Sequence, residues 1–185
     1  MTCAMFNLQF DPDKISALEK QYLETRKGAE KDARMERAGK EILAGAKTRK
    51  NLEIIFRWKA ARAVHHLSKN KTKDIRRCLT EAVNAKDDRS AIVALVRDSS
   101  LETGLHGIQV PVASAILTAI FPNRFTVIDY KALASLGCPQ DFPGVGFYLE
   151  YLRTCRRIKD ENRVSLRTLD RALWQWWANR EKSSD

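Results

Sequence analysis

One stretch constrains the fold of this chain most strongly: residues 105–137, which read LHGIQVPVASAILTAIFPNRFTVIDYKALASLG. Gly107, near its start, permits a positive φ and therefore a tight turn. Pro111 follows, and proline is favoured in the first turn of a helix, where a missing N–H costs least. The residues from there to Phe121 are small or apolar. We therefore expect a buried helix that ends just before Pro122, since the residue before a proline resists the α conformation.

A short apolar segment and an acid complete the stretch. Phe125 to Ile128 is the one part of the chain with a brief strand-like alternation, and it leads directly into Asp129. An aspartate in front of a helical pattern is a preferred N-cap, so we expect Asp129 to cap a helix that begins at Tyr130. The predicted order is a glycine turn, a buried helix, an extended segment and an acid at the head of another helix.

This order resembles the helix-hairpin-helix superfamily of DNA glycosylases. In that family a hairpin that usually reads L-P-G-V-G precedes a helix of small residues, and a V-D pair follows at a helix start. Here Leu105 to Gln109 stands at the hairpin, and Val127 to Asp129 stands at the segment that bears the catalytic aspartate. The spacing from turn to acid agrees with the family. The match is specific over these residues and extends to residues 50–180 only at the level of helix order.

The resemblance implies an all-α fold, a single helical domain that contains a helix-hairpin-helix motif. We expect residues 49–181 to form the glycosylase-like domain. Residues 1–48 lie outside the resemblance and are expected to form an N-terminal helical extension packed on that domain. A length of 185 residues also fits one domain. The helix before the hairpin should be short or offset from the turn, because Arg97 to Gly104 interrupts the helical pattern.

Other helices are expected from hydrophobic periodicity and capping residues. Thr72 and Ser165 are candidate N-caps, and a third is either Asp87 or Asp88. The glycines within the first helical stretch argue against one straight rod. The expected helices cover residues 13–47, 49–68, 73–85, the stretch after 88, 145–159 and the stretch from 166 onwards.

The net charge of +10 is concentrated in one third of the chain. Residues 26–77 hold 17 Lys/Arg and 6 Asp/Glu, a net charge of +11, whereas residues 1–25 sum to −2 and residues 78–185 to +1. A phosphate backbone is the natural partner of such a surface, although a basic stretch alone is more often a solvated face. Beside a glycosylase-like hairpin, we interpret it as a surface that binds double-stranded DNA.

Asp129 is the expected catalytic residue. Breaking an N-glycosidic bond builds positive charge on the sugar, and a fixed carboxylate can stabilise that charge or orient the attacking water. A role as an N-cap alone is the alternative. Bifunctional members of the family carry a nucleophilic lysine in the turn-to-helix segment, where this chain has Pro111. The resemblance therefore implies a monofunctional DNA glycosylase that leaves an abasic site.

The resemblance also implies residues that contact the DNA and the flipped base. Lys131 matches the position of a phosphate-contacting histidine in many relatives, with a solvated surface lysine as the alternative. Trp58 and Tyr130 are the candidates for a base-pocket wall, whereas Trp176 and Trp177 are expected in the core. Four turn residues are expected to bind the DNA backbone through a helix N-terminus and N–H groups: Gly107, Ile108, Gln109 and Val110.

No protein-bound cofactor or small-molecule cofactor is expected. The cysteines at 3, 78, 138 and 155 show neither zinc spacing nor the iron–sulfur spacing of some relatives, so we expect free thiols and a cytoplasmic location. The family's turn can hold a monovalent cation, but Gln109 replaces the second glycine here. No apolar run approaches the ~20 residues of a membrane helix, so no membrane partner is expected. The expected state is a monomer.

Two other functions stay open at this point. The first is a non-catalytic DNA-binding protein that keeps the hairpin, which Gln109 and the interrupted first helix favour. The second is an RNA-binding or host-interaction protein that uses the basic helices. The excised base is also open among uracil, alkylated, oxidised and phage-type modified bases, in either a repair or a phage-defence setting.

Overall fold

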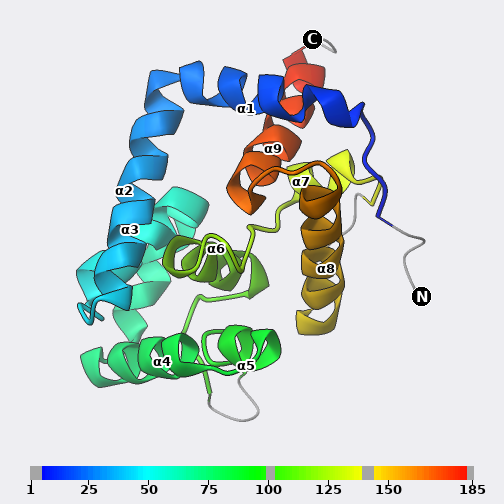
Figure 1. Cartoon of the computed structure of the whole chain (residues 1–185). Helices are drawn as coiled ribbons and strands as arrows, with labels where there is room; N and C mark the ends of the chain where they lie inside the picture. Colours follow the sequence, from blue (N-terminus) through cyan, green and yellow to red (C-terminus); the bar gives the residue numbers. More distant parts are fainter. Residues whose placement is uncertain (1–5, 99–102, 139–143, 183–185) are drawn as a thin grey trace. The chain divides into compact units, whose positions relative to one another are not determined.

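The computed structural model describes residues 6–98, 103–138 and 144–182, and their regular structure is helical (Figure 1). No β-strand occurs among these residues, and one isolated bridge pairs Asp98 with Thr103. The predicted all-α class is therefore confirmed. The helices are η1 (Pro12–Lys14), α1 (Ile15–Glu24), α2 (Arg26–Leu43), α3 (Arg49–Ala60), η2 (Ala61–Lys69), α4 (Thr72–Asn84), α5 (Asp88–Val93), α6 (Val110–Ile120), α7 (Tyr130–Ser135), α8 (Val145–Glu161) and α9 (Leu166–Lys182).

The chain forms two compact units. Met1–Glu30 and Thr126–Asp185 make the first unit, and Lys31–Phe125 makes the second. α2 begins in the first unit and ends in the second. The predicted division at residue 48, between an extension and a glycosylase-like domain, stays a prediction.

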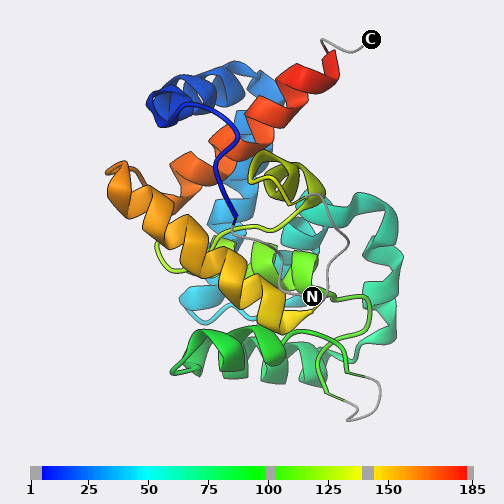
Figure 2. The same cartoon turned by 90° about the vertical axis from the view of Figure 1, so that its right-hand side faces the viewer.

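In the first unit, α9 is the helix on which the others pack. α1, α7 and α8 all contact it, and Figures 1 and 2 both show α1 lying across α9. Leu166, Leu169 and Leu173 are buried along one side of α9, at the spacing of an amphipathic helix. Phe10, from the segment before α1, stacks on Trp176 with ring centroids 5.5 Å apart. Trp176 and Trp177, expected in the core, are half-buried.

In the second unit, the core is built around α6. α3 and α5 pack against α6, η2 packs against α3, and α4 packs against α5. The predicted buried helix is confirmed, because Ala113, Ile116 and Leu117 are inaccessible to solvent. α2 passes so close to α6 that a Cβ on Gly39 would lie 2.0 Å from the carbonyl oxygen of Ala119. A glycine at this position is what lets the two helices touch.

Local capping follows the sequence at most positions. Asp87 caps α5 by accepting from the Ser90 N–H at 2.8 Å, and Ser165 accepts from the Thr168 N–H at 2.9 Å. The prediction that Thr72 is a cap is wrong. α4 begins at Thr72 itself, and its N-cap residue makes no side-chain cap bond. An acid in the first turn of α4, Asp74, stabilises this helix start through the helix dipole instead.

Two expected helices are shorter than predicted. The first breaks at Thr25, between α1 and α2, so it is not one rod. The helix expected over residues 49–68 ends at Ala60 and continues as the 3₁₀ helix η2. The helix before the hairpin is short, as predicted: α5 ends at Val93.

The prediction of four free thiols holds for Cys78 and Cys155, which are free and buried. It is wrong for Cys138, which is disulfide-bonded. Disulfides depend on the proximity of two Cβ atoms in space, which sequence spacing does not reveal. Among the described residues, no helix combines the length and the apolar character that crossing a membrane requires.

Candidate nucleic-acid interface and catalytic acid

The turn over residues 105–110 of the second unit, the position of the predicted hairpin, has the positive φ that the sequence predicts at Gly107. Gly107 has a φ of +80°, the left-handed region that favours glycine. The Ile108 N–H donates to the carbonyl oxygen of Leu105 at 3.1 Å, which closes the turn. The Arg97 N–H donates to the carbonyl oxygen of Ile108 at 2.9 Å. The turn is thus tied both to itself and to the chain that precedes it.

The four turn residues differ in what they can present to a ligand. Ile108 is fully buried, and its N–H and carbonyl groups are already bonded to Leu105 and Arg97, so it presents no polar group to a ligand. Val110 is 5% exposed, and its apolar side chain is buried. Gln109 is exposed and is the N-cap residue of α6, without a side-chain cap bond. Pro111 lies in the first turn of α6, as predicted. The turn therefore offers backbone groups and one flexible amide side chain.

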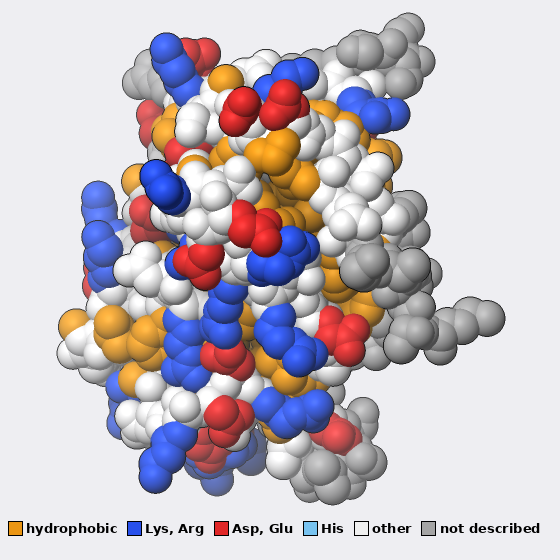
Figure 3. All heavy atoms as spheres, turned by 45° about the vertical axis from the view of Figure 1, so that its right-hand side comes forward, with side chains coloured by type: hydrophobic (Ala, Val, Ile, Leu, Met, Phe, Trp, Pro, Cys, Tyr) orange, Lys and Arg blue, Asp and Glu red, His pale blue; other side chains and the backbone are white. Residues whose placement is uncertain are grey.

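Almost all of the net positive charge lies in the second unit. Residues 31–125 hold 19 Lys/Arg and 10 Asp/Glu, a net charge of +9, whereas the first unit holds 14 and 13, a net charge of +1. Figure 3 shows Lys and Arg side chains exposed on the face it draws, with Asp and Glu side chains among them. The exposed basic residues of the second unit include Lys31, Arg34, Arg37, Lys40, Lys50, Arg62, Lys69, Lys71, Lys73 and Arg76.

A basic loop lies against the hairpin turn. The loop, defined here as residues 68–73 (SKNKTK), comprises the last two residues of η2, the linking residues Asn70 and Lys71, and the first two residues of α4. The side chain of Asn70 bonds both backbone polar groups of His106, next to Gly107. The structure therefore brings exposed lysines of the loop to the turn. Sequence analysis missed this role of Asn70, because a lone asparagine in a polar loop carries no pattern.

Asp129 lies in the first unit and caps α7. Its Oδ1 accepts from the Ala132 N–H at 2.9 Å, so the predicted cap is confirmed. The segment that leads to it is held from α8: the Tyr151 hydroxyl donates to the carbonyl oxygen of Val127 at 2.7 Å. The Tyr148 hydroxyl donates to the preceding carbonyl oxygen at 3.0 Å. Both tyrosines are buried, and burial raises the pKa of Tyr151 well above its usual value. The half-buried Asp129 therefore follows a backbone segment that two tyrosine hydroxyls hold in place.

The two residues after Asp129 contact an acid on α9. The Lys131 ammonium pairs with Glu181 Oε2 at 2.6 Å, and it lies 4.7 Å from the centroid of the Trp174 ring. The Tyr130 hydroxyl donates to Glu181 Oε1 at 2.6 Å and accepts from the indole N–H of Trp177. The Lys131 and Tyr130 hydrogen bonds lower the pKa of Glu181 to about 2. Glu181 is a second residue that sequence analysis missed.

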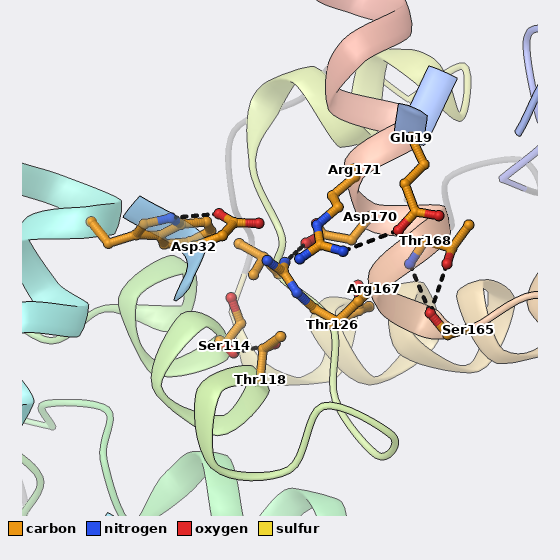
Figure 4. A network of polar contacts seen from close by, with 12 residues as sticks. Glu19, Asp32, Ser114, Thr118, Thr126, Ser165, Arg167, Thr168, Asp170 and Arg171 are labelled. Atoms are coloured by element: carbon orange, nitrogen blue, oxygen red, sulfur yellow. Dashed lines mark hydrogen bonds and ion pairs between the residues drawn. The ribbon is translucent and has the colours of Figure 1, made fainter. Parts of the chain in front are cut away.

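The other base-pocket candidate, Trp58, lies in the second unit. Its indole N–H donates to Asp32 Oδ1 at 2.9 Å, and Asp32 is fully buried in α2 (Figure 4). A buried carboxylate that accepts an indole N–H fixes the ring in one orientation. The base pocket formed by Trp58 and Tyr130 stays a prediction, since the two side chains belong to different units.

The first unit has two further ion pairs around α9 (Figure 4). Arg171 pairs with Glu19 of α1 at 3.0 Å, and Arg167 pairs with Asp170 within the helix. Among residues 6–98, 103–138 and 144–182, no three His, Cys, Asp or Glu side chains lie in positions that could hold a metal ion.

No known protein family, no curated protein and no solved structure gives a significant match to this chain. Its function is therefore inferred from the turn, the basic loop and the aspartate.

Proposed function

We propose that this chain is a monofunctional DNA N-glycosylase. It would bind double-stranded DNA, flip a modified or damaged base out of the helix and hydrolyse its N-glycosidic bond. The observation that carries the proposal is Asp129, a half-buried carboxylate at the start of α7 on a backbone segment anchored by two buried tyrosine hydroxyls. An acid held in this way can meet charge that develops on a bound sugar without first having to be reoriented.

The charge of the second unit supports DNA as the substrate. A net charge of +9 over residues 31–125, with exposed lysines beside the hairpin turn, attracts the phosphate backbone of a duplex. Phosphate contacts of this kind position the protein and carry no sequence information. Selection of the target would then depend on which base can be flipped and accommodated.

In the proposed reaction, Asp129 stabilises charge on the sugar, and a water molecule is the nucleophile. As the bond from C1′ to the base nitrogen breaks, positive charge builds on the sugar, and the carboxylate stabilises it. Water adds to C1′ and supplies a proton to the departing base, so the strand stays intact and bears an abasic site. Pro111, at the position of the family's lysine nucleophile, has an amide nitrogen that cannot form an imine.

A second function is a non-catalytic DNA-binding protein. Two observations favour it: Gln109 stands where the family has a glycine, and α5 ends at Val93, well before the turn. Lys131, the expected phosphate contact, is already paired with Glu181. A protein of this kind would bind duplex DNA as proposed and excise nothing.

A panel of labelled duplexes, each with a single uracil, alkylated or oxidised base, tests the two functions. With enzyme in excess, the glycosylase should convert at least one duplex to a product that breaks only after alkali. Borohydride added during turnover should trap no protein–DNA adduct. Duplex binding without any alkali-labile product across the panel would reject the glycosylase and leave the binding protein.

A further inference from the structure

One buried side chain joins the basic loop to the hairpin turn. Asn70 is 5% exposed and lies at the centre of the loop over residues 68–73. Its Nδ2 donates to the carbonyl oxygen of His106 at 3.1 Å, and its Oδ1 accepts from the His106 N–H at 2.7 Å. One amide thus satisfies both backbone polar groups of a residue 36 positions further along the chain. This two-point contact defines where the loop lies relative to the turn.

Two other contacts hold the same junction. Arg49, at the start of α3, donates through its guanidinium to the carbonyl oxygens of Leu67 and Asn70. On the turn, Gly107 lies so close to η2 that a Cβ there would be 2.5 Å from the Cβ of His66. The loop backbone is therefore held from α3 and from the turn at once, so its conformation does not depend on a bound ligand.

The residues on either side of Asn70 are exposed lysines. Lys69 precedes it and Lys71 follows it, and both side chains face solvent. The turn contributes its own exposed residue, Gln109, three positions after His106. A buried amide flanked by two exposed ammonium groups sets the position of both charges beside the turn.

We propose that Asn70 is a positioning residue for DNA binding: it holds Lys69 and Lys71 beside the hairpin turn, so that loop and turn contact the phosphates of one duplex together. This inference rests on the proposed function, because it takes duplex DNA as the partner. Phosphates repeat regularly along a strand, so two protein segments bind them together only when the segments are correctly spaced. A preordered loop also loses less conformational freedom on binding, which increases affinity.

Asn51 provides the matched control. It lies in the same unit, is 4% exposed, and its Nδ2 donates to the carbonyl oxygen of Ala46 at 3.0 Å. Both asparagines therefore use a buried amide to hold loop backbone. Asn51, however, holds the residues before α3, whereas Asn70 holds the lysines beside the turn. Replacing either one should lower thermal stability, but only the replacement of Asn70 should change DNA binding.

The experiment measures the Kd of the full chain for a short undamaged duplex across a series of salt concentrations. The variants are Asn70→Ala, Asn51→Ala and the double variant Lys69→Gln/Lys71→Gln. We expect Asn70→Ala to weaken binding about tenfold and to reduce the salt slope by about two, since each lost phosphate contact removes about 0.9 from it. Asn51→Ala should keep the wild-type affinity and slope.

Combining the variants separates positioning from stability. If Asn70 acts through the two lysines, adding Asn70→Ala to the double lysine variant causes no further loss of affinity. Losses that simply add would overturn the inference. The Asn70 Nδ2 also donates to the carbonyl oxygen of Leu67 at 3.3 Å. If Asn70→Ala is unfolded at the assay temperature, Asn70→Ser replaces it, because a serine hydroxyl can still bond this local carbonyl while losing His106.

Failure of this inference and failure of the proposed function give different results. A wild-type chain that binds no duplex overturns both. A wild-type chain that binds with a steep salt dependence, alongside an Asn70→Ala variant with unchanged affinity and slope, overturns the positioning role alone.

Discussion

The two units differ in net charge. The second unit has a net charge of +9 and exposes many of its basic side chains, including those of the loop beside the turn. The first unit has a net charge of +1, and several of its basic residues are paired with acids inside the unit. The pairs described in the first unit are Lys131–Glu181, Arg157–Glu161, Lys159–Asp160, Arg167–Asp170 and Arg171–Glu19. Those described in the second unit are Arg57–Glu53, Arg77–Glu81 and Arg124–Asp88. The count of basic residues alone, 19 against 14, understates this difference.

The difference in net charge suggests that DNA binding and base excision depend on different units. The second unit has the charge that attracts a polyanion, whereas the first unit has the anchored carboxylate that can act on a sugar. Binding and excision should therefore respond to different substitutions. The predictions below test that separation, beginning with the largest expected effect.

Asp129→Asn should abolish most excision without weakening DNA binding. Asparagine is also a good N-cap, so α7 and the fold should be kept. Loss of the charge that stabilises the sugar cation should slow single-turnover excision by about 10²–10³-fold. The matched control is Asp87→Asn, which changes the aspartate that caps α5 in the second unit. Equal excision rates for the two variants would show that Asp129 acts only as an N-cap.

Replacing three lysines of the second unit should weaken DNA binding more than replacing three basic residues of the first. The variants are Lys69→Gln/Lys71→Gln/Lys73→Gln and Lys20→Gln/Arg153→Gln/Arg163→Gln, all at exposed positions. The first set should lower affinity about 10- to 100-fold and reduce the salt slope by about three. Fluorescence anisotropy with a labelled duplex measures both quantities. Equal losses of DNA affinity from the two sets would show that the second unit is not the preferred DNA-binding surface.

Glu181→Gln should tighten DNA binding slightly. Glu181 pairs with Lys131 at 2.6 Å, and the substitution would release that lysine for a phosphate. Since exposed ion pairs are weak, we expect only a small gain in affinity, of about 2- to 5-fold. The control is Glu161→Gln, which frees Arg157 on α8 instead. If both variants bind equally well, Lys131 has no special role in binding.

The smallest expected effect is on acid stability. The folded-state pKa of Glu181 is lowered to about 2 from 4.5, chiefly by its bond to Lys131. A carboxyl with a depressed pKa stabilises the fold above its unfolded pKa, and that contribution is lost as the pH falls toward the folded value. The Tm difference between wild type and Glu181→Gln should therefore shrink as the pH falls from 6 toward 2. A difference that stays constant over this range would exclude the ion pair as its source.

Local determinants made part of the fold predictable from the sequence. The cap of Asp129 on Ala132, the positive φ of Gly107 and the buried helix after Pro111 each depend on neighbours within a few positions. The predicted cap at Thr72 was wrong, because a threonine before a helical pattern can be the first residue of the helix as readily as its N-cap.

The missed residues all act over long separations. Asn70 reaches His106 across 36 positions, Glu181 reaches Lys131 across 50, and Asp32 reaches Trp58 across 26. Such partners are chosen by the packing of helices, which hydrophobic periodicity does not specify. For this reason the sequence indicated a basic DNA-binding surface without showing which lysines stand beside the turn.

Hydrogen exchange, compared between the free chain and the chain with duplex DNA, locates the DNA-binding surface. If the duplex binds the second unit at the loop over residues 68–73 and the turn over residues 105–110, exchange in these two segments should slow together when DNA is added. The slowing should be greater there than in α8 or in the loop after it. Unchanged exchange in both segments, under conditions where the duplex is bound, would show that DNA does not bind at the loop and the turn.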